Sequence, residues 1–210
     1  MGKNRFIRND SRGNATKTQE LDLMINSSND DSPIFGLGQC SLDYIGIIPA
    51  YPPPNVKCEF SNLHIGGGGP VATAMVALSR WGMSCYFAGV VGDDEFGKTI
   101  LESLHNEGID TGGVVTRIGH SSQFAFITAE PALCRRTIFW QRPTGIPLKI
   151  DEIDLDKLRS SRMFYTDGLH TEASVFACRK AKDAGIPVIV DAGTLREGML
   201  EIATLSDCFI

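Results

Sequence analysis

Chemistry in this sequence is concentrated in three glycine-containing segments. They are Gly38–Asp43 (GQCSLD), Gly68–Ala74 (GGPVATA) and Val91–Gly97 (VGDDEFG). Glycine lets the backbone approach a ligand closely, and the N–H groups at a helix N-terminus attract anionic or hydroxylated groups. The segments are therefore compatible with the binding of a phosphate group, a dinucleotide or a hydroxylated small molecule.

The phosphate-binding pattern G-x-x-x-x-G-K-[ST] is matched by residues 92–99 (GDDEFGKT). Such a loop works because its backbone N–H groups converge on the phosphates. Here Asp93, Asp94 and Glu95 lie inside the loop, and three carboxylates would repel a polyanion. We therefore interpret the match as accidental, and we expect the segment to shape a strand-to-helix turn.

The dinucleotide pattern G-x-G-x-x-A is matched by Gly67, Gly69 and Ala72, with Asp93 at about the distance expected of a ribose-binding acid. This interpretation would make the protein an NAD-dependent oxidoreductase. However, the strand before the glycines would be only residues 63–65, whereas the pattern needs a full buried strand that runs straight into the turn. We keep it as an alternative.

In order and spacing, the three segments together resemble the N-terminal signature of the ribokinase-like, or PfkB-type, carbohydrate kinases. The resemblance covers residues 35–97 and continues more weakly as far as Asp191. It implies an α/β fold, a ribokinase-like three-layer sandwich with a mostly parallel sheet and a small β lid. It also implies ATP-dependent phosphorylation of a hydroxyl group on a sugar or sugar derivative, with this chain carrying the sugar-binding part.

The resemblance implies roles for four residues around the sugar. Asp43 would accept hydrogen bonds from sugar hydroxyls, and Gly68 and Gly69 would bring the backbone close to the substrate. Thr73 stands where most members of the family carry Asn, and a hydroxyl reaches less far than an amide. The identity of the sugar therefore stays open. Arg142, Lys149 and the four histidines have no spacing that singles them out.

The cofactors that the resemblance implies are ATP and Mg²⁺. Asp191 follows a predicted strand and resembles the start of the family's Asp-x-Asn-x-Arg segment, although Gly193 replaces the Asn. The family's catalytic Asp belongs to a Gly-Ala-Gly-Asp motif that is absent from these residues. We therefore expect no catalytic residue in this chain and no kinase activity of the chain alone. A non-catalytic sugar-binding remnant is the second alternative.

The elements that position these segments follow from apolar periodicity. Residues 1–33 are polar and are predicted to be a disordered tail, so the folded part, residues 34–210, begins near Ile34. Short apolar runs then alternate with stretches of helical period, which indicates βα units on a parallel sheet. The predicted strands are 34–48, 85–91, 163–165, 188–190 and one that begins within 205–210, and the predicted helices are 71–81, 96–104 and 173–184. The first of these helices is apolar on nearly all sides, so we expect it to be buried, and Gly82 and Gly108 are expected to end the first two helices.

Two segments, residues 44–66 and 112–142, depart from this alternation. The second contains a predicted hairpin of residues 123–128 and 136–140. In the family, two such excursions combine into the lid that closes over the sugar, and lid strands often pair between subunits, which implies a possible homodimer. Because the last predicted strand is not followed by a crossover helix, we expect the C-terminal part of the kinase fold to be missing.

Composition excludes several other classes of protein. A net charge of −5 leaves no basic surface for nucleic acid, and no stretch approaches the roughly 20 apolar residues of a membrane span. The six cysteines are far apart and form no metal-binding pattern. We therefore expect a cytoplasmic protein with no nucleic acid, membrane or structural metal, and the resemblance implies a small-molecule sugar as its partner.

Overall fold

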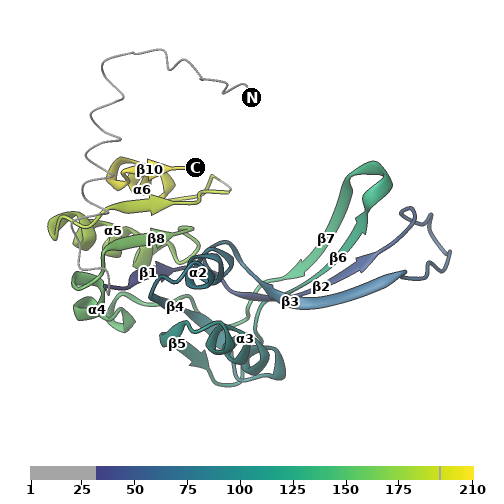
Figure 1. Cartoon of the computed structure of the whole chain (residues 1–210), viewed down its shortest axis with the longest axis horizontal. Helices are drawn as coiled ribbons and strands as arrows, with labels where there is room; N and C mark the ends of the chain where they lie inside the picture. Colours follow the sequence, from purple (N-terminus) through teal and green to yellow (C-terminus); the bar gives the residue numbers. More distant parts are fainter. Residues whose placement is uncertain (1–31, 194) are drawn as a thin grey trace, which may run out of the picture.

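A six-stranded parallel sheet forms the centre of the protein, and a computed structural model describes residues 32–193 and 195–210 (Figure 1). All its neighbouring strands pair in parallel, in the order β10-β9-β8-β1-β4-β5. The strands are β1 (Ile34–Leu37), β4 (Cys85–Gly92), β5 (Asp110–Arg117), β8 (Met163–Thr166), β9 (Val188–Val190) and β10 (Cys208–Phe209). Apart from Ser32 and Pro33, the predicted tail lies outside the described residues.

Helices cover both faces of this sheet. Alternate residues of one strand enter two different cores: Ile34 packs with α2 and α3, whereas Phe35 packs with α4, α5 and α6. All eight residues of β4 are buried for the same reason. The helices are α2 (Pro70–Arg80), α3 (Glu95–Asn106), α4 (Leu155–Arg159), α5 (Thr171–Asp183) and α6 (Met199–Leu205), with short 3₁₀ turns at Pro131–Leu133 and Ile150–Glu152. The predicted three-layer α/β fold is confirmed.

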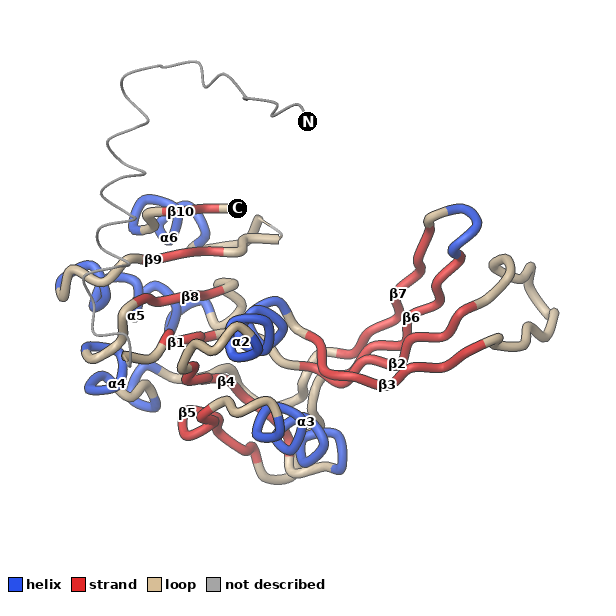
Figure 2. The backbone as a smooth tube through the Cα atoms, in the orientation of Figure 1, coloured by secondary structure: helices blue, strands red, loops and turns tan. Residues whose placement is uncertain are grey.

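A second sheet of four strands projects from the body (Figure 2). Its order is β3-β2-β6-β7, and we call this sheet with its connecting loops the lid. The strands are β2 (Ser41–Ile47), β3 (Asn62–Gly68), β6 (Phe124–Glu130) and β7 (Arg135–Gln141). The central pair, β2 and β6, is parallel, so two excursions that are distant in sequence meet in one sheet.

Two predicted boundaries were wrong. The single strand 34–48 is two strands in two sheets, because the chain turns at 38–40 and passes from the body into the lid. The second excursion begins after Arg117 and not at 112, because β5 pairs with β4 in the central sheet. In both cases the pairing partner, and not the apolar pattern, decides the boundary. The strand predicted to begin within 205–210 is present as Cys208–Phe209, and the helix α6 (Met199–Leu205) before it was not predicted.

The predicted helix 71–81 is present as α2, but it is not buried on all sides. Val71, Ala72 and Met75 face the core, whereas Trp81, the residue that ends the helix, is 75% exposed. Gly82 follows with a φ of 85°, a left-handed conformation that glycine adopts without strain. The end of the helix was therefore predicted correctly, and the burial of its last turn was not.

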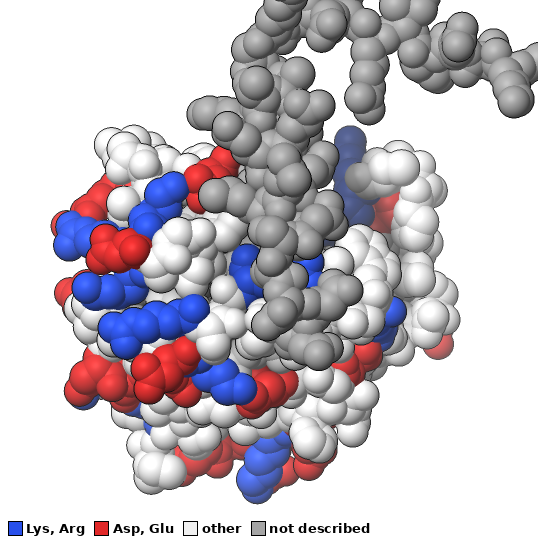
Figure 3. Space-filling view, turned by 60° about the vertical axis from the view of Figure 1, so that its left-hand side comes forward, with Lys and Arg blue, Asp and Glu red and all other residues white. Residues whose placement is uncertain are grey.

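The surface of the body carries charges of both signs. On the face in Figure 3, basic and acidic side chains are interspersed and not gathered into areas of one sign. Several are paired, for example Lys182 with Asp207 at 2.8 Å and Lys157 with Asp110 at 3.1 Å. Within the described ranges, no helix is long and apolar enough to cross a membrane.

Candidate functional site

The central sheet reverses its strand order at β1. From β1 the chain adds β4 and β5 on one side, and later β8, β9 and β10 on the other. Ligands of open α/β sheets bind outside the carboxyl ends of the strands at such a switch point. In this protein Gly38 and Gln39 follow β1 there, and Asp167 follows β8.

Asp167 connects the carboxyl ends of β1 and β8. Its Oδ2 accepts a hydrogen bond of 2.8 Å from the Gln39 backbone N–H, and its Oδ1 accepts one of 2.9 Å from Leu169. The side chain is buried, and burial raises the pKa of the Asp167 carboxyl to about 6. Asp167 was not predicted from the sequence, although its place shortly after the predicted strand 163–165 was the signal that could have identified it.

Two glycines let the chain pass closely at this point. A Cβ on Gly38 would lie 2.6 Å from Asp167 Oδ2, and a Cβ on Gly69 would lie 2.3 Å from the Gln39 carbonyl oxygen. Gly69 also has a φ of 96°, which disfavours every other residue type. The turn after β1 therefore packs directly against the start of α2.

Asp43 lies at the base of the lid, beside the glycines. The Ser41 hydroxyl donates a hydrogen bond of 2.8 Å to Asp43 Oδ1. A Cβ on Gly68 would lie only 2.2 Å from Asp43 Oδ2, so glycine at this position makes room for the carboxylate. The structure thus brings together Asp43 and Gly68, two of the residues that the sequence singled out.

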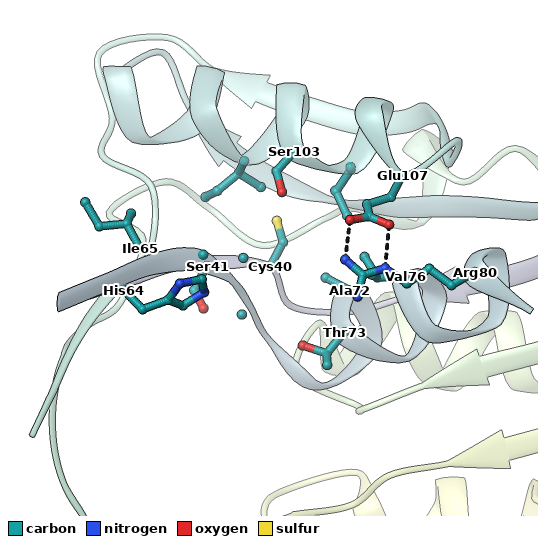
Figure 4. Close-up of a pocket in the computed structure, with 15 residues that line it drawn as sticks. Cys40, Ser41, His64, Ile65, Ala72, Thr73, Val76, Arg80, Ser103 and Glu107 are labelled. Atoms are coloured by element: carbon teal, nitrogen blue, oxygen red, sulfur yellow. Dashed lines mark hydrogen bonds and ion pairs between the residues drawn. The ribbon is translucent and has the colours of Figure 1, made fainter. Parts of the chain in front are cut away.

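Thr73 lies in the first turn of α2 and is exposed. It lines a cavity of about 370 Å³ together with Ser41 and Gly68 (Figure 4). At the far end of this cavity α2 and α3 are joined by an ion pair, in which Arg80 Nε donates to Glu107 Oε2 at 2.7 Å. The four predicted sugar-site residues, Asp43, Gly68, Gly69 and Thr73, therefore surround the start of α2.

Asp191 lies apart from these four residues, beyond the end of β9. Its backbone N–H donates to the Thr166 carbonyl at 3.0 Å, which continues the pairing of β8 and β9. Its charge adds to the effect of burial in raising the pKa of Asp167. Asp167 and Asp191 are thus carboxylates on adjacent strand ends.

The family model described as "pfkB family carbohydrate kinase" matches residues 34–209. The chain belongs to this family. Probable fructokinase-4 of Arabidopsis thaliana is 29% identical over 177 residues, which are 82% of this chain and 51% of that protein. This pfkB-family chain therefore spans about half the length of the curated relatives that it matches.

Solved structures agree on the fold of this pfkB-family chain. A putative ribokinase from Agrobacterium tumefaciens is similar with a TM-score of 0.77 and 23% identity, over 83% of this chain and 57% of that one. A ribokinase from Arabidopsis thaliana, solved with ribose and ATP, is similar with a TM-score of 0.63 and 20% identity, over 78% of this chain and 54% of that one.

The third glycine segment of this pfkB-family chain anchors the lid. Asp94 Oδ1 accepts hydrogen bonds from the Gly97 N–H at 2.8 Å and the Ser122 hydroxyl at 2.6 Å, and its Oδ2 accepts one from the Ser122 N–H at 2.9 Å. The Gly92 N–H donates to Ser122 Oγ. These N–H groups are occupied by the protein's own side chains, which supports the structural interpretation of residues 92–99.

The dinucleotide pattern also lies in the wrong kind of element. Gly67 belongs to β3, which pairs antiparallel with β2 in the lid. A dinucleotide site requires the glycines to follow a strand of the parallel sheet. Membership of the carbohydrate kinase family and this topology together argue against the oxidoreductase alternative.

Proposed function

We propose that the protein at its native full length phosphorylates a hydroxyl group of a sugar with ATP, and that residues 34–209 bind the sugar. The observation that carries the proposal is the position of Asp43, whose carboxylate lies at the base of the lid beside the start of α2. A carboxylate there accepts hydrogen bonds from sugar hydroxyls, and the adjacent helix N-terminus favours electron-rich oxygens. Together these groups would orient the sugar, which is how positioning accelerates a transfer between two substrates.

ATP and Mg²⁺ are the cofactors that we propose, on the basis of family membership. Asp191 is the residue of this chain that we propose lies toward the nucleotide, because it follows the strand next to β8. Among the described residues no group of three His, Cys, Asp or Glu side chains is arranged to hold a metal ion. The Gly-Ala-Gly-Asp motif is absent from these 210 residues, and we propose that the chain alone does not phosphorylate sugars.

We also propose that the lid forms a homodimer contact. In one row across the lid, Ile65 lies opposite Tyr44, Tyr44 opposite Phe126, and Phe126 opposite Phe139. At the two ends of this row Ile65 is 50% exposed and Phe139 is 49% exposed. An exposed apolar face of this kind is typical of an interaction surface.

The test of the proposed kinase activity is ADP release by the full-length protein with a panel of sugars, compared with that of Asp43→Asn. We expect the variant to raise KM for the accepted sugar roughly 10- to 100-fold, because hydrogen bonds to a charged group are lost. Asp151→Asn, at an exposed carboxylate outside the site, is the matched control. Sugar binding without ADP release would favour the non-catalytic alternative, and stabilisation by NAD alone would contradict the assignment.

A further inference from the structure

A row of residues crosses the lid from Asp43 to Trp140. Asp43 lies opposite Ala125 on β6, and Ala125 lies opposite Trp140 on β7. Directly opposed residues point to the same face of a sheet, so the carboxylate and the indole share one face of the lid. Two strand spacings, roughly 10 Å, separate their backbones.

This shared face is turned toward the switch point of the central sheet. On the opposite face, Leu42 packs into the core with α2 and α3, and the Tyr44 ring lies 6.1 Å from the ring of Phe96 on α3. The face with Trp140 borders a cavity of about 150 Å³ whose other wall includes Leu169 and His170, the second and third residues after Asp167. Trp140 therefore faces the same region as Asp43 and the carboxyl end of β8.

Arg142 is held over Trp140 in this cavity. Its guanidinium carbon lies 5.0 Å from the centre of the indole ring, which is the geometry of a cation–π contact. Such a contact uses the flat face of the guanidinium and leaves its N–H edges available for a planar anion. Arg142 and Trp140 are both exposed.

The cavity has one positive charge and no negative charge. None of its lining side chains is acidic, and Arg142 is the only lining residue with a permanent charge. Within the described part of the chain no carboxylate pairs with Arg142, whereas Arg117 is held by Glu152 through two hydrogen bonds of 2.6 and 2.7 Å. The planar guanidinium matches the geometry of a carboxylate or phosphate, so Arg142 is available to pair with an anion of the ligand.

We infer that Arg142, supported by Trp140, binds an anionic substituent of the sugar, so that the substrate is a sugar acid or a sugar phosphate and not a neutral sugar. This inference rests on the proposed function, because it concerns the substrate of the same site. Asp43 accepts hydrogen bonds from the hydroxyl groups at one end of the sugar. Arg142 donates two parallel hydrogen bonds to the carboxylate or phosphate at the other end.

The test compares kcat and KM of the full-length protein for neutral, carboxylated and phosphorylated sugars. The neutral sugars are fructose and ribose, the sugar acids are gluconate and 2-keto-3-deoxygluconate, and the sugar phosphate is fructose 6-phosphate. We expect one anionic class to be preferred at least about tenfold in kcat/KM. A hydrogen bond to a charged group contributes a free energy that corresponds to about this ratio. Activity confined to fructose or ribose would overturn the inference and leave the proposed function intact.

The variants are Arg142→Ala, Arg142→Lys and, as matched control, Arg135→Ala. Arg135 is an exposed arginine at the start of β7, near the lid tip and on the face opposite to Trp140, whereas Arg142 directly follows the end of β7. We expect Arg142→Ala to raise KM for the anionic sugar roughly 10- to 100-fold and Arg142→Lys to raise it less, because lysine keeps the charge but loses the planar fork. Arg135→Ala should leave KM unchanged. An equal fall in kcat for every sugar would assign Arg142 to phosphoryl transfer and overturn the inference.

Calorimetric titration without nucleotide keeps the inference separate from the proposed function. If no sugar is phosphorylated, the proposed function fails, but anionic sugars that bind to the wild type and not to Arg142→Ala still support the subsite. If neutral and anionic sugars bind equally to both proteins, or none binds to either, the subsite is contradicted.

Discussion

At the scale of single residues, buried polar side chains hold the switch point together. Asp167 binds the Gln39 N–H across 128 positions of sequence. His170 accepts a hydrogen bond from Leu148 at Nδ1, and its ring also hydrogen-bonds the Gly38 carbonyl. Gly38 precedes the lid and Leu148 follows it, so His170 joins the point where the chain leaves the body to the point where it returns.

This position of His170 predicts a specific pH dependence of stability. Burial lowers its pKa from 6.5 to about 4, so between these values the unfolded chain binds more protons than the folded one. Stability therefore rises with pH across this window and is lost as pH falls from 6.5 toward 4, by about 3 kcal/mol in total. Burial raises the pKa of Asp167 from 3.8 to about 6, and this acts in the opposite direction.

The measurement is urea unfolding of the wild type and of His170→Gln from pH 4 to pH 7. Glutamine keeps one donor and one acceptor but does not titrate. Because the Asp167 effect is common to both proteins, the difference between their free energies of unfolding isolates His170. We expect the variant to lose less stability on acidification. Parallel pH profiles would contradict the role assigned to this side chain.

At the scale of elements, the turn between β4 and α3 fixes the position of β6, the first strand of the second half of the lid. Asp94 is both the N-cap of α3 and the partner of Ser122, two residues before β6. A Cβ on Gly92 would lie 2.1 Å from the His120 carbonyl oxygen, so the two segments are in close contact. The position of β6, and with it that of the row Asp43, Ala125 and Trp140, depends on this turn.

We expect Asp94→Ala to destabilise the protein and to weaken sugar binding. The substitution removes a helix cap and two hydrogen bonds to Ser122, which should lower the free energy of unfolding by about 1 to 3 kcal/mol. Chemical denaturation measures the stability, and calorimetry measures the affinity. Glu95→Ala is the matched control, because Glu95 lies in the same turn but only forms an exposed pair with Lys98. Equal effects of the two substitutions would argue against an anchoring role.

At the scale of the whole molecule, the lid is a sheet with two different faces. The face with Asp43 and Trp140 is turned toward the switch point, whereas the face with Ile65 and Phe139 is apolar and exposed. Its outer strands β3 and β7 are open sheet edges. Exposed apolar faces and open edges favour association, which supports the proposed dimer.

We expect the wild type to sediment as a dimer at micromolar concentration and Phe139→Glu to sediment as a monomer. The charged side chain would be placed in the contact, and burying it without a partner is costly. Val56→Asp, in the loop at the lid tip where the side chain is 56% exposed, is the control and should remain dimeric. A monomeric wild type at every concentration tested would contradict the proposed contact.

Local properties of the sequence were sufficient for the family, the fold class and most helices. Glycine, proline and capping residues act over a few positions, so the ends of α2 and α3 follow from Gly82 and Gly108, both with positive φ. The order and spacing of Gly68, Gly69 and Asp43 likewise identified the residues around the start of α2. Such signals are readable in sequence because the interactions that produce them are local.

Only the tertiary structure decided which residues share a face with Asp43. Trp140 is 97 positions away from it in sequence, and the two meet because β2 pairs in parallel with β6 and β6 pairs with β7. Arg142 carried no signal in its spacing, and Asp167 was missed because its partner Gln39 lies in the turn after another strand, 128 positions away in sequence. An apolar alternation predicts that a strand exists but not which strand it pairs with, because pairing depends on the free energy of the whole packed sheet.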